Sequence, residues 1–148
     1  MSGASRSPVF GANGMVASSQ NAATAAGIDI LRRGGSAVDA AIATNAALSV
    51  IEPHMCGMGG DLFALIWDPV KNALVGLNAS GRSPRALSFE ELHDSSENGH
   101  VPGRGPLSVT TPGAVDGWCE LHENYGRLSL GEVLEPAAAH PMTKTAAT

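Results

Sequence analysis

The sequence has 148 residues, a formal net charge of -5 at pH 7 and 43% hydrophobic residues. This length suits one ordinary hydrophobic core or a piece of a larger one, and an acidic chain without a basic stripe argues against nucleic acid as a partner. Because no stretch approaches the roughly 18 consecutive apolar residues of a membrane helix, and the start lacks the apolar core of a signal peptide, we expect no membrane partner and a cytoplasmic protein.

The first elements are an arm, a short strand and a helix. Residues 1–13 are polar and rich in glycine, and we interpret them as a flexible N-terminal arm. GMVAS at residues 14–18 has the composition of a strand. A helix is expected from Ser19, with Ser and Asn as candidate caps, an alanine-rich body, two arginines in the last turn and a Gly-Gly pair as its stop.

Residues 36–52 predict a second helix, which follows at once. Ser36 and Asp39 have the spacing of a capping box. The segment carries no charge between Asp39 and Glu52, and Pro53 ends it. A helix with so few charges is expected to be buried on most of its circumference.

A hairpin and a long polar excursion are predicted next. DLFALIWD (residues 61–68) and ALVGLNAS (residues 73–80) are apolar runs joined by the turn sequence PVKN, a pattern typical of an antiparallel hairpin. Residues 81–106 are polar and interrupted by Pro and Gly, so we expect a surface excursion with one helical turn near Phe89–Leu92. The large aromatic side chains are expected to anchor the core: Phe63, Trp67 and Trp118.

Three further elements are predicted after the excursion. LSVTTPG (residues 107–113) is strand-like, residues 114–126 form an amphipathic helix, and Ser129 with Glu132 caps a last helix, LGEVLEPAAAH. Helices followed by a hairpin, another strand and more helices predict a layered α/β or α+β fold. Since the sequence ends soon after the last helix begins, we expect a fragment.

The glycine cluster GMGGD (residues 57–61) stands between the second helix and the hairpin. A phosphate-binding loop has the opposite order, because its glycines must precede a helix N-terminus whose amides face the anion. We therefore interpret the cluster as a helix stop followed by close backbone packing, with a positive φ or a close contact at Gly59 and Gly60. Asp61 is expected to hold this turn by accepting backbone amides.

Two cysteines and two histidines are the candidate metal ligands or nucleophiles. His54, Cys56, Cys119 and His122 suit a metal by residue type, but the spacings HxC and CxxH match no common zinc module. We therefore expect no metal, and two cysteines so far apart predict no disulfide framework. A Cys–His nucleophilic pair is open on residue types alone, although no third, orienting group can be named.

Three stretches of the sequence match one family in the same order. The first, residues 14–68, contains GGSAVDAA and then EPHMCGMGG, and it is followed by LNASGRSPRA and by VTTPGAVDGWCELHENYGRLSLGEVLEPA. Together they resemble the amino-terminal part of the large subunit of the γ-glutamyltransferase family, also called γ-glutamyltranspeptidase or glutathione hydrolase. The resemblance covers residues 14 to 138.

This resemblance implies an α+β fold of the N-terminal-nucleophile hydrolase type, an αββα sandwich of which residues 14–148 are an incomplete N-terminal portion. Family members are proenzymes that cleave themselves into a large and a small subunit. The new amino-terminal Thr of the small subunit attacks a γ-glutamyl amide such as glutathione, and the acyl group passes to water or an amino acid. The expected partners are therefore a γ-glutamyl substrate, the remainder of the large subunit and the small subunit.

The resemblance assigns no catalytic residue, cofactor or metal to this chain. Thr110 and Thr111 do not correspond to the nucleophile, because VTTPGAVDGW matches a large-subunit stretch and a Pro follows the pair. The chain alone is expected to be inactive.

One binding residue carries over from the family. The Arg of its GR-xP stretch, which binds the α-carboxylate of the glutamyl group, corresponds to Arg82 in ASGRSPRA. A guanidinium offers a planar fork of donors to a carboxylate and stays charged at any working pH. Arg85 is the neighbouring alternative and is expected to be solvated. NASGRSP is closer to acylase-like or amidohydrolase-like branches than to the glutathione enzymes, which leaves the substrate open.

Two other functions stay open. A noncatalytic paralogue would keep a carboxylate pocket around Arg82 for binding or regulation, or would pair with a full-length homologue. Without the resemblance, the glycines would suit a small nucleotide-binding α/β domain.

Overall fold

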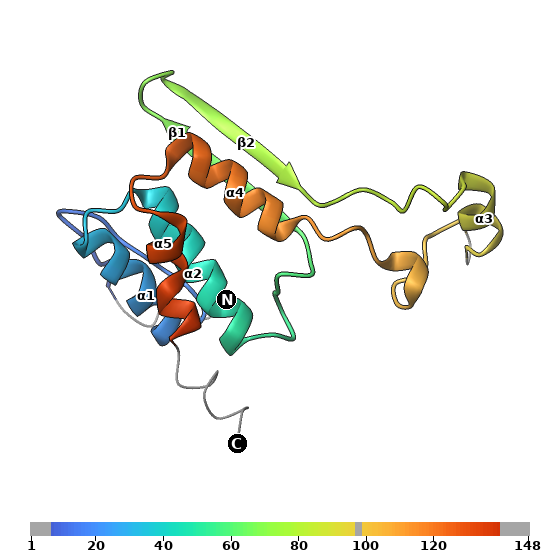
Figure 1. Cartoon of the computed structure of the whole chain (residues 1–148), viewed down its shortest axis with the longest axis horizontal. Coiled ribbons are helices and arrows are strands. Elements are labelled where there is room, and N and C mark those ends of the chain that lie inside the picture. The colour runs from blue at the N-terminus through green and yellow to red at the C-terminus, as the bar shows by residue number, and fades with distance from the viewer. Residues whose placement is uncertain (1–6, 97–98, 140–148) are drawn as a thin grey trace.

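A computed structural model describes residues 7–96 and 99–139. Helices pack against one face of a hairpin, and the irregular excursion of residues 81–106 extends away from these elements and returns to them (Figure 1). In chain order the elements are α1 (Asn21–Arg32), α2 (Ala37–Ile51), β1 (Leu62–Asp68), β2 (Ala73–Ala79), α3 (Phe89–Asp94), the 3-10 turn η1 (Pro106–Ser108), α4 (Ala114–Tyr125) and α5 (Leu130–Ala138).

Helix α2 is the centre of the core, as its uncharged sequence predicts. It packs against α1, α4 and α5, and small side chains allow a close approach. The largest fully buried apolar side chains come from three different helices: Ile30, Ile42 and Val133. Gly27 of α1 has no room for a side chain, because a Cβ there would meet Val16 at 2.9 Å and Ala40 O at 3.1 Å. Small residues therefore fill this core, with Trp118 as its one large aromatic among the described residues.

The predicted capping boxes are confirmed, whereas the predicted cap of the first helix is wrong. Ser36 and Asp39 exchange both hydrogen bonds at the start of α2, and Ser129 and Glu132 do so at the start of α5. At α1 the N-cap is Gln20, whose side chain makes no capping bond. The hydroxyl of Ser19 instead donates to Glu52 Oε2 at 2.7 Å, because the end of α2 lies next to the start of α1.

Asp39 joins α2 to the turn between α4 and α5. Its fully buried carboxylate accepts at Oδ2 from the amides of Ser36 (2.8 Å), Arg127 (2.9 Å) and Leu128 (3.3 Å). Burial alone raises the pKa of this carboxyl, but the hydrogen bonds outweigh it, and the pKa lies below its usual value. The Leu128 carbonyl in turn lies 2.7 Å from His122 Nε2.

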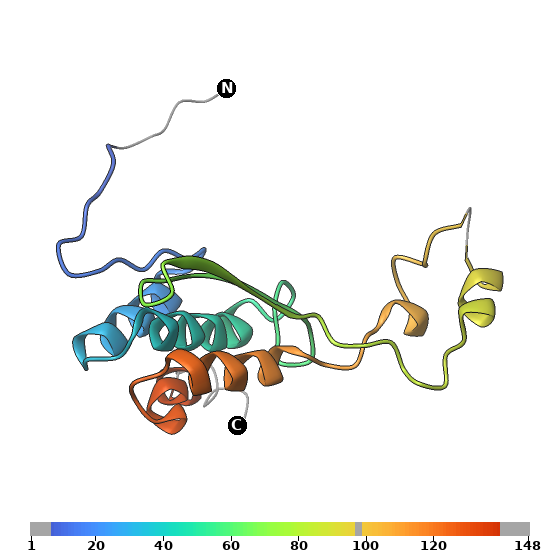
Figure 2. The same ribbon diagram turned by 90° about the horizontal axis from the view of Figure 1, so that it is seen from above.

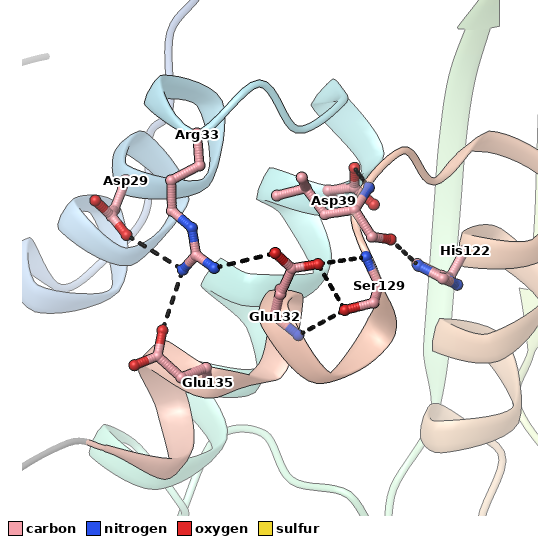
Figure 3. A network of polar contacts seen from close by, with 8 residues as sticks. Asp29, Arg33, Asp39, His122, Ser129, Glu132 and Glu135 are labelled. Carbon is pink, nitrogen blue, oxygen red and sulfur yellow. Dashed lines mark hydrogen bonds and ion pairs between the residues drawn. The ribbon is translucent and has the colours of Figure 1, made fainter.

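Arg33 makes ion pairs on the outside of the same helical group (Figure 3). Its guanidinium lies 3.7 Å from Asp29, 3.7 Å from Glu132 and 3.1 Å from Glu135. These contacts link the end of α1 to α5. Because the acidic partners are at least half exposed, the pairs contribute little to stability compared with the buried side chains beneath them.

The predicted hairpin is confirmed, and its antiparallel register pairs Leu62 with Ala79 and Asp68 with Ala73. Asp68 Oδ1 accepts from the turn amides of Val70 and Lys71. One face of the hairpin, which includes Leu62, packs against the helical core. Figure 2 shows the hairpin lying across the helices from above.

The other face of the hairpin is apolar and exposed, and it corrects the prediction that Phe63 and Trp67 are core residues. Phe63 is 68%, Leu65 76% and Trp67 59% exposed, and Leu74 lies opposite Trp67. We call these four residues the outer hairpin face. Strand alternation puts them on the side away from the helices, where nothing in the described part of the chain covers them. Trp118 is 3% exposed, as predicted.

Two predicted strands are not present. Residues 14–18 are irregular, and Val16 packs against the helical core without a neighbouring strand. Residues 107–113 form the end of η1 and an extended segment. A strand needs a paired backbone, and within the described ranges β1 and β2 pair only with each other. The predicted helical turn near Phe89 is confirmed as α3.

The α+β class is confirmed, as one helical layer against one face of a small sheet. Residues 7–13 of the predicted arm are irregular and exposed. Residues 1–6 of that arm and residues 140–148 lie outside the described part. Within the described ranges, no helix is both long and apolar enough to cross a bilayer.

Candidate functional site

The glycine turn before β1 holds the start of α4 and shows neither expected strain nor expected crowding. Gly59 and Gly60 do not have positive φ. A Cβ on Gly59 would meet nothing within 4 Å, and one on Gly60 only an ordinary contact at 3.4 Å. That prediction is therefore wrong for the described chain. The Gly60 carbonyl instead accepts from the amides of Gly113 (3.1 Å) and Ala114 (3.0 Å), which cap α4 in the absence of a side-chain cap.

The close backbone contact lies elsewhere, between residues 79–82 and residues 110–114. Gly81 has φ +76°, and a Cβ on it would overlap the Thr111 carbonyl. A Cβ on Gly113 would overlap the Ala79 carbonyl and lie 2.7 Å from the Gly81 amide nitrogen. Two glycines therefore let two segments far apart in sequence cross in contact at the end of β2.

Hydrogen bonds fasten this crossing. The Thr111 amide donates to the Arg82 carbonyl at 2.9 Å. The Thr110 hydroxyl donates to the Ser80 carbonyl at 2.9 Å, with Asp61 Oδ1 as a second acceptor at 3.1 Å. Asp61 thus holds the turn through a hydroxyl of a distant segment, and not through the backbone amides that we predicted.

Arg82 is one of the residues that line a hollow of about 680 Å³ at this crossing. Its side chain is exposed and, within residues 7–96 and 99–139, has no ion-pair partner. The hollow is lined by the end of β2, the crossing segment and the first turn of α4, including Arg85, Thr111 and Asp116. A free guanidinium beside polar backbone is suited to a carboxylate.

The other candidate residues do not assemble into a site. Among the described residues, no group of three or more acidic, His or Cys side chains could hold a metal ion. Cys56 and Cys119 are both free thiols. Burial and the nearby Glu52 carboxylate raise the pKa of the Cys56 thiol, which lowers its thiolate fraction. His122 Nε2 contacts the Leu128 carbonyl, not a thiol.

The binding role of Arg82 stays a prediction, and the sequence did not indicate the residues that hold its backbone. The sequence predicts neither the contact of Thr110 with Ser80 nor the crossing of Gly81 and Gly113. The sequence carries a glycine in each of NASGR and TTPGA, but it gives no signal that these two segments lie in contact.

The fold is shared with solved N-terminal-nucleophile hydrolases. The crystal structure of cephalosporin acylase from Bacillus halodurans is 47% identical, with a TM-score of 0.80 over 90% of this chain and 25% of that one. The gamma-glutamyltranspeptidase of Helicobacter pylori is 29% identical, with a TM-score of 0.76 over 88% of this chain and 38% of that one.

The sequence comparison gives the family. The model of the gamma-glutamyltranspeptidase family matches residues 23–141. The glutathione hydrolase-like YwrD proenzyme of Bacillus subtilis is 43% identical over 130 residues, which are 87% of this chain and 24% of that protein. The chain belongs to the gamma-glutamyltranspeptidase family. It spans about a quarter of the length of this curated relative.

Proposed function

We propose that residues 14–148 are a partial domain, the N-terminal part of the large subunit of a γ-glutamyltransferase-like proenzyme, and that residues 1–13 lie outside this domain. In this proposal the chain binds the free carboxylate of the acyl donor through Arg82. The observation that carries the proposal is the exposed Arg82, which has no ion-pair partner among the described residues and lines a hollow between two distant segments, the end of β2 with the residues after it and the segment that leads into α4.

Arg82 is a better anion ligand here than the nearby helix N-terminus. The Gly60 carbonyl occupies the amides of Gly113 and Ala114, so these donors of α4 are not available to a substrate. A guanidinium has a planar pair of donors that matches a carboxylate. The hollow therefore favours a carboxylate held by a side chain over a phosphate held by backbone amides, which counts against the nucleotide-binding alternative.

The chain supplies binding and not the nucleophile. The Thr110 hydroxyl is engaged with the Ser80 carbonyl and Asp61, and Thr110 is preceded by a peptide bond, so it lacks the free amine that an N-terminal nucleophile uses as its base. The raised pKa of Cys56 disfavours its thiolate. Acyl transfer then requires a Thr from outside this chain.

The outer hairpin face is the proposed contact with the rest of the enzyme. Phe63, Leu65 and Trp67 form an uncharged exposed surface, and contiguous apolar surface of this kind is characteristic of interfaces. Its cover would be the remainder of the large subunit together with the small subunit, as in a four-layer sandwich.

A second candidate is an acylase or amidohydrolase of the same family. It is supported by the higher identity to the cephalosporin acylase, 47%, than to the Helicobacter transpeptidase, 29%. The two candidates differ in the acyl group that they would take, and a γ-glutamyl group carries an α-amine beside its carboxylate.

A chimera tests the proposal. Residues 14–148 replace the matching first quarter of the Bacillus subtilis proenzyme, and self-cleavage and hydrolysis of γ-glutamyl p-nitroanilide are measured. Arg82→Lys is expected to raise KM about tenfold or more with little change in the melting temperature, because a point charge replaces a bidentate fork. Arg104→Lys, on the excursion, is the matched control and is expected to leave KM unchanged.

The outcome separates the alternatives. An unchanged KM in Arg82→Lys contradicts the assignment, and a raised KM in Arg85→Lys instead gives the role to that residue. Preference for glutaryl p-nitroanilide, which lacks the α-amine, favours the acylase candidate. A chimera that binds both anilides and cleaves neither favours a noncatalytic paralogue.

A further inference from the structure

Thr110 occupies the point where three segments of the chain meet. It belongs to the extended segment that follows η1, and its side chain is partly buried. Its hydroxyl reaches the Ser80 carbonyl after β2 at 2.9 Å and Asp61 Oδ1 before β1 at 3.1 Å. One hydroxyl therefore ties together the two ends of the hairpin and the segment that leads into α4.

Hydrogen bonds from Thr110 and Thr111 hold the backbone on both sides of the Gly81–Arg82 peptide. The Thr110 hydroxyl holds the Ser80 carbonyl, and the next residue, Thr111, donates its amide to the Arg82 carbonyl at 2.9 Å. Between the two ties lies Gly81, at φ +76°. Because glycine is the residue with the greatest backbone freedom, the direction of the Arg82 side chain depends on the ties on either side of Gly81.

Asp61 accepts a hydrogen bond from Thr110 and, among the described residues, forms no ion pair with Arg82. The guanidinium therefore keeps its full charge for a ligand, although a carboxylate is fixed at the same crossing.

We propose that Thr110, with Asp61 as its second acceptor, is a positioning residue that sets the orientation of Arg82 toward a substrate carboxylate. The inference rests on the proposed function of Arg82. The hydroxyl does not contact the reacting atoms; it restricts the turn at Gly81 so that the guanidinium fork is oriented before binding. Preorganisation of this kind raises affinity by reducing the ordering cost of binding.

The test compares Thr110→Val, which keeps the shape and removes the donor, with Thr110→Ser, which restores it. Residue-resolved amide exchange of Thr111 and the Kd for L-glutamate are measured on the 148-residue chain. Thr110→Val is expected to speed exchange at Thr111 about tenfold and to weaken L-glutamate binding about fivefold, since a carbonyl loses its donor. Thr110→Ser should match the wild type in both, and α2 amides should exchange equally slowly in all three.

A second variant covers the case in which Thr110→Val does not fold. Asp61→Ala removes only the second acceptor from an exposed residue, and it is expected to weaken L-glutamate binding about twofold. Wild-type binding that neither variant weakens overturns the positioning role alone. No L-glutamate binding by the wild type overturns the proposed function of Arg82, and the positioning role with it.

Discussion

The helical group of α1, α2, α4 and α5 and the hairpin differ in how completely each buries its apolar residues. The helices enclose Ile30, Ile42 and Val133 among themselves. The hairpin buries one face on these helices and leaves Phe63 and Trp67 exposed. The excursion that follows it extends away from the body in both views (Figures 1 and 2).

This difference shows which part of the chain is structurally complete. Helices α2 and α5 satisfy their N-terminal amides with capping boxes, and the helices bury their apolar side chains against one another. A two-stranded sheet has two faces, and the described part of this chain covers one of them. We therefore expect the helical group to determine the stability of the chain, whereas the hairpin keeps one apolar face exposed and leads into the crossing at which Arg82 lies.

The two large tryptophans give the largest expected contrast. Trp118 is buried and donates from Nε1 to Asn45 Oδ1 at 2.9 Å, so Trp118→Ala should lower the free energy of unfolding by about 3–5 kcal/mol. Trp67→Ala, on the outer hairpin face, should lower it by less than about 1 kcal/mol. Urea denaturation measures both.

Self-association should rank the two variants in the opposite order, with Trp67→Ala having the larger effect. Trp67→Ala is expected to reduce light scattering and binding of a hydrophobic dye, because it shortens the exposed apolar patch. Equal destabilisation by both changes would contradict the division between a complete helical group and an uncovered hairpin.

The pH dependence of the free energy of unfolding tests how far Asp39 stabilises the helical group. Because the pKa of its carboxyl is lowered in the folded state, its stabilisation is present above the unfolded pKa of about 4 and is lost as the pH falls through the folded pKa. Asp39→Asn should cost about 2 kcal/mol at pH 7. The difference between the two proteins should shrink at pH 3 in parallel urea titrations, and a constant difference would argue against this linkage.

Glycine substitutions sharpen the comparison within the hairpin region. Gly113→Ala should lower stability by about 1–3 kcal/mol, because a Cβ there would overlap the Ala79 carbonyl. Gly59→Ala is expected to be neutral within about 0.5 kcal/mol, since nothing lies within 4 Å of its Cβ position. Thermal melting of both variants measures these losses. A larger loss in Gly59→Ala than in Gly113→Ala would mean that the close backbone contact lies in the turn before β1.

Arg33 is expected to have only a small effect on stability, although Figure 3 shows it among three carboxylates. Arg33→Gln should cost about 0.5–1 kcal/mol at low salt, because the pairs are largely solvated. Molar salt should remove most of this difference. A larger, salt-independent loss would mean that α5 depends on Arg33 for docking.

Local signals in the sequence predicted the helices, the hairpin and the capping boxes, because Ser36 and Ser129 act within one turn of chain. The wrong predictions concern features that depend on contacts between segments far apart in the sequence. Strand composition at residues 14–18 cannot provide a partner strand, and alternation in β1 cannot reveal which face is covered. The prediction for Arg82 rests on the family resemblance. The contacts of Thr110 could not be predicted, because they join it to residues 30 and 49 positions away in the sequence.

The most direct test of the central claim, that this chain binds a carboxylate and does not supply the nucleophile, is release of p-nitroaniline from γ-glutamyl p-nitroanilide. The 148-residue chain is purified away from any host enzyme, and binding of L-glutamate is measured on the same preparation. The account predicts binding that Arg82→Lys weakens and no turnover, since acyl transfer needs a free N-terminal nucleophile. Turnover that persists after mutation of Thr110 and Thr111 but disappears with Cys56→Ala would contradict it.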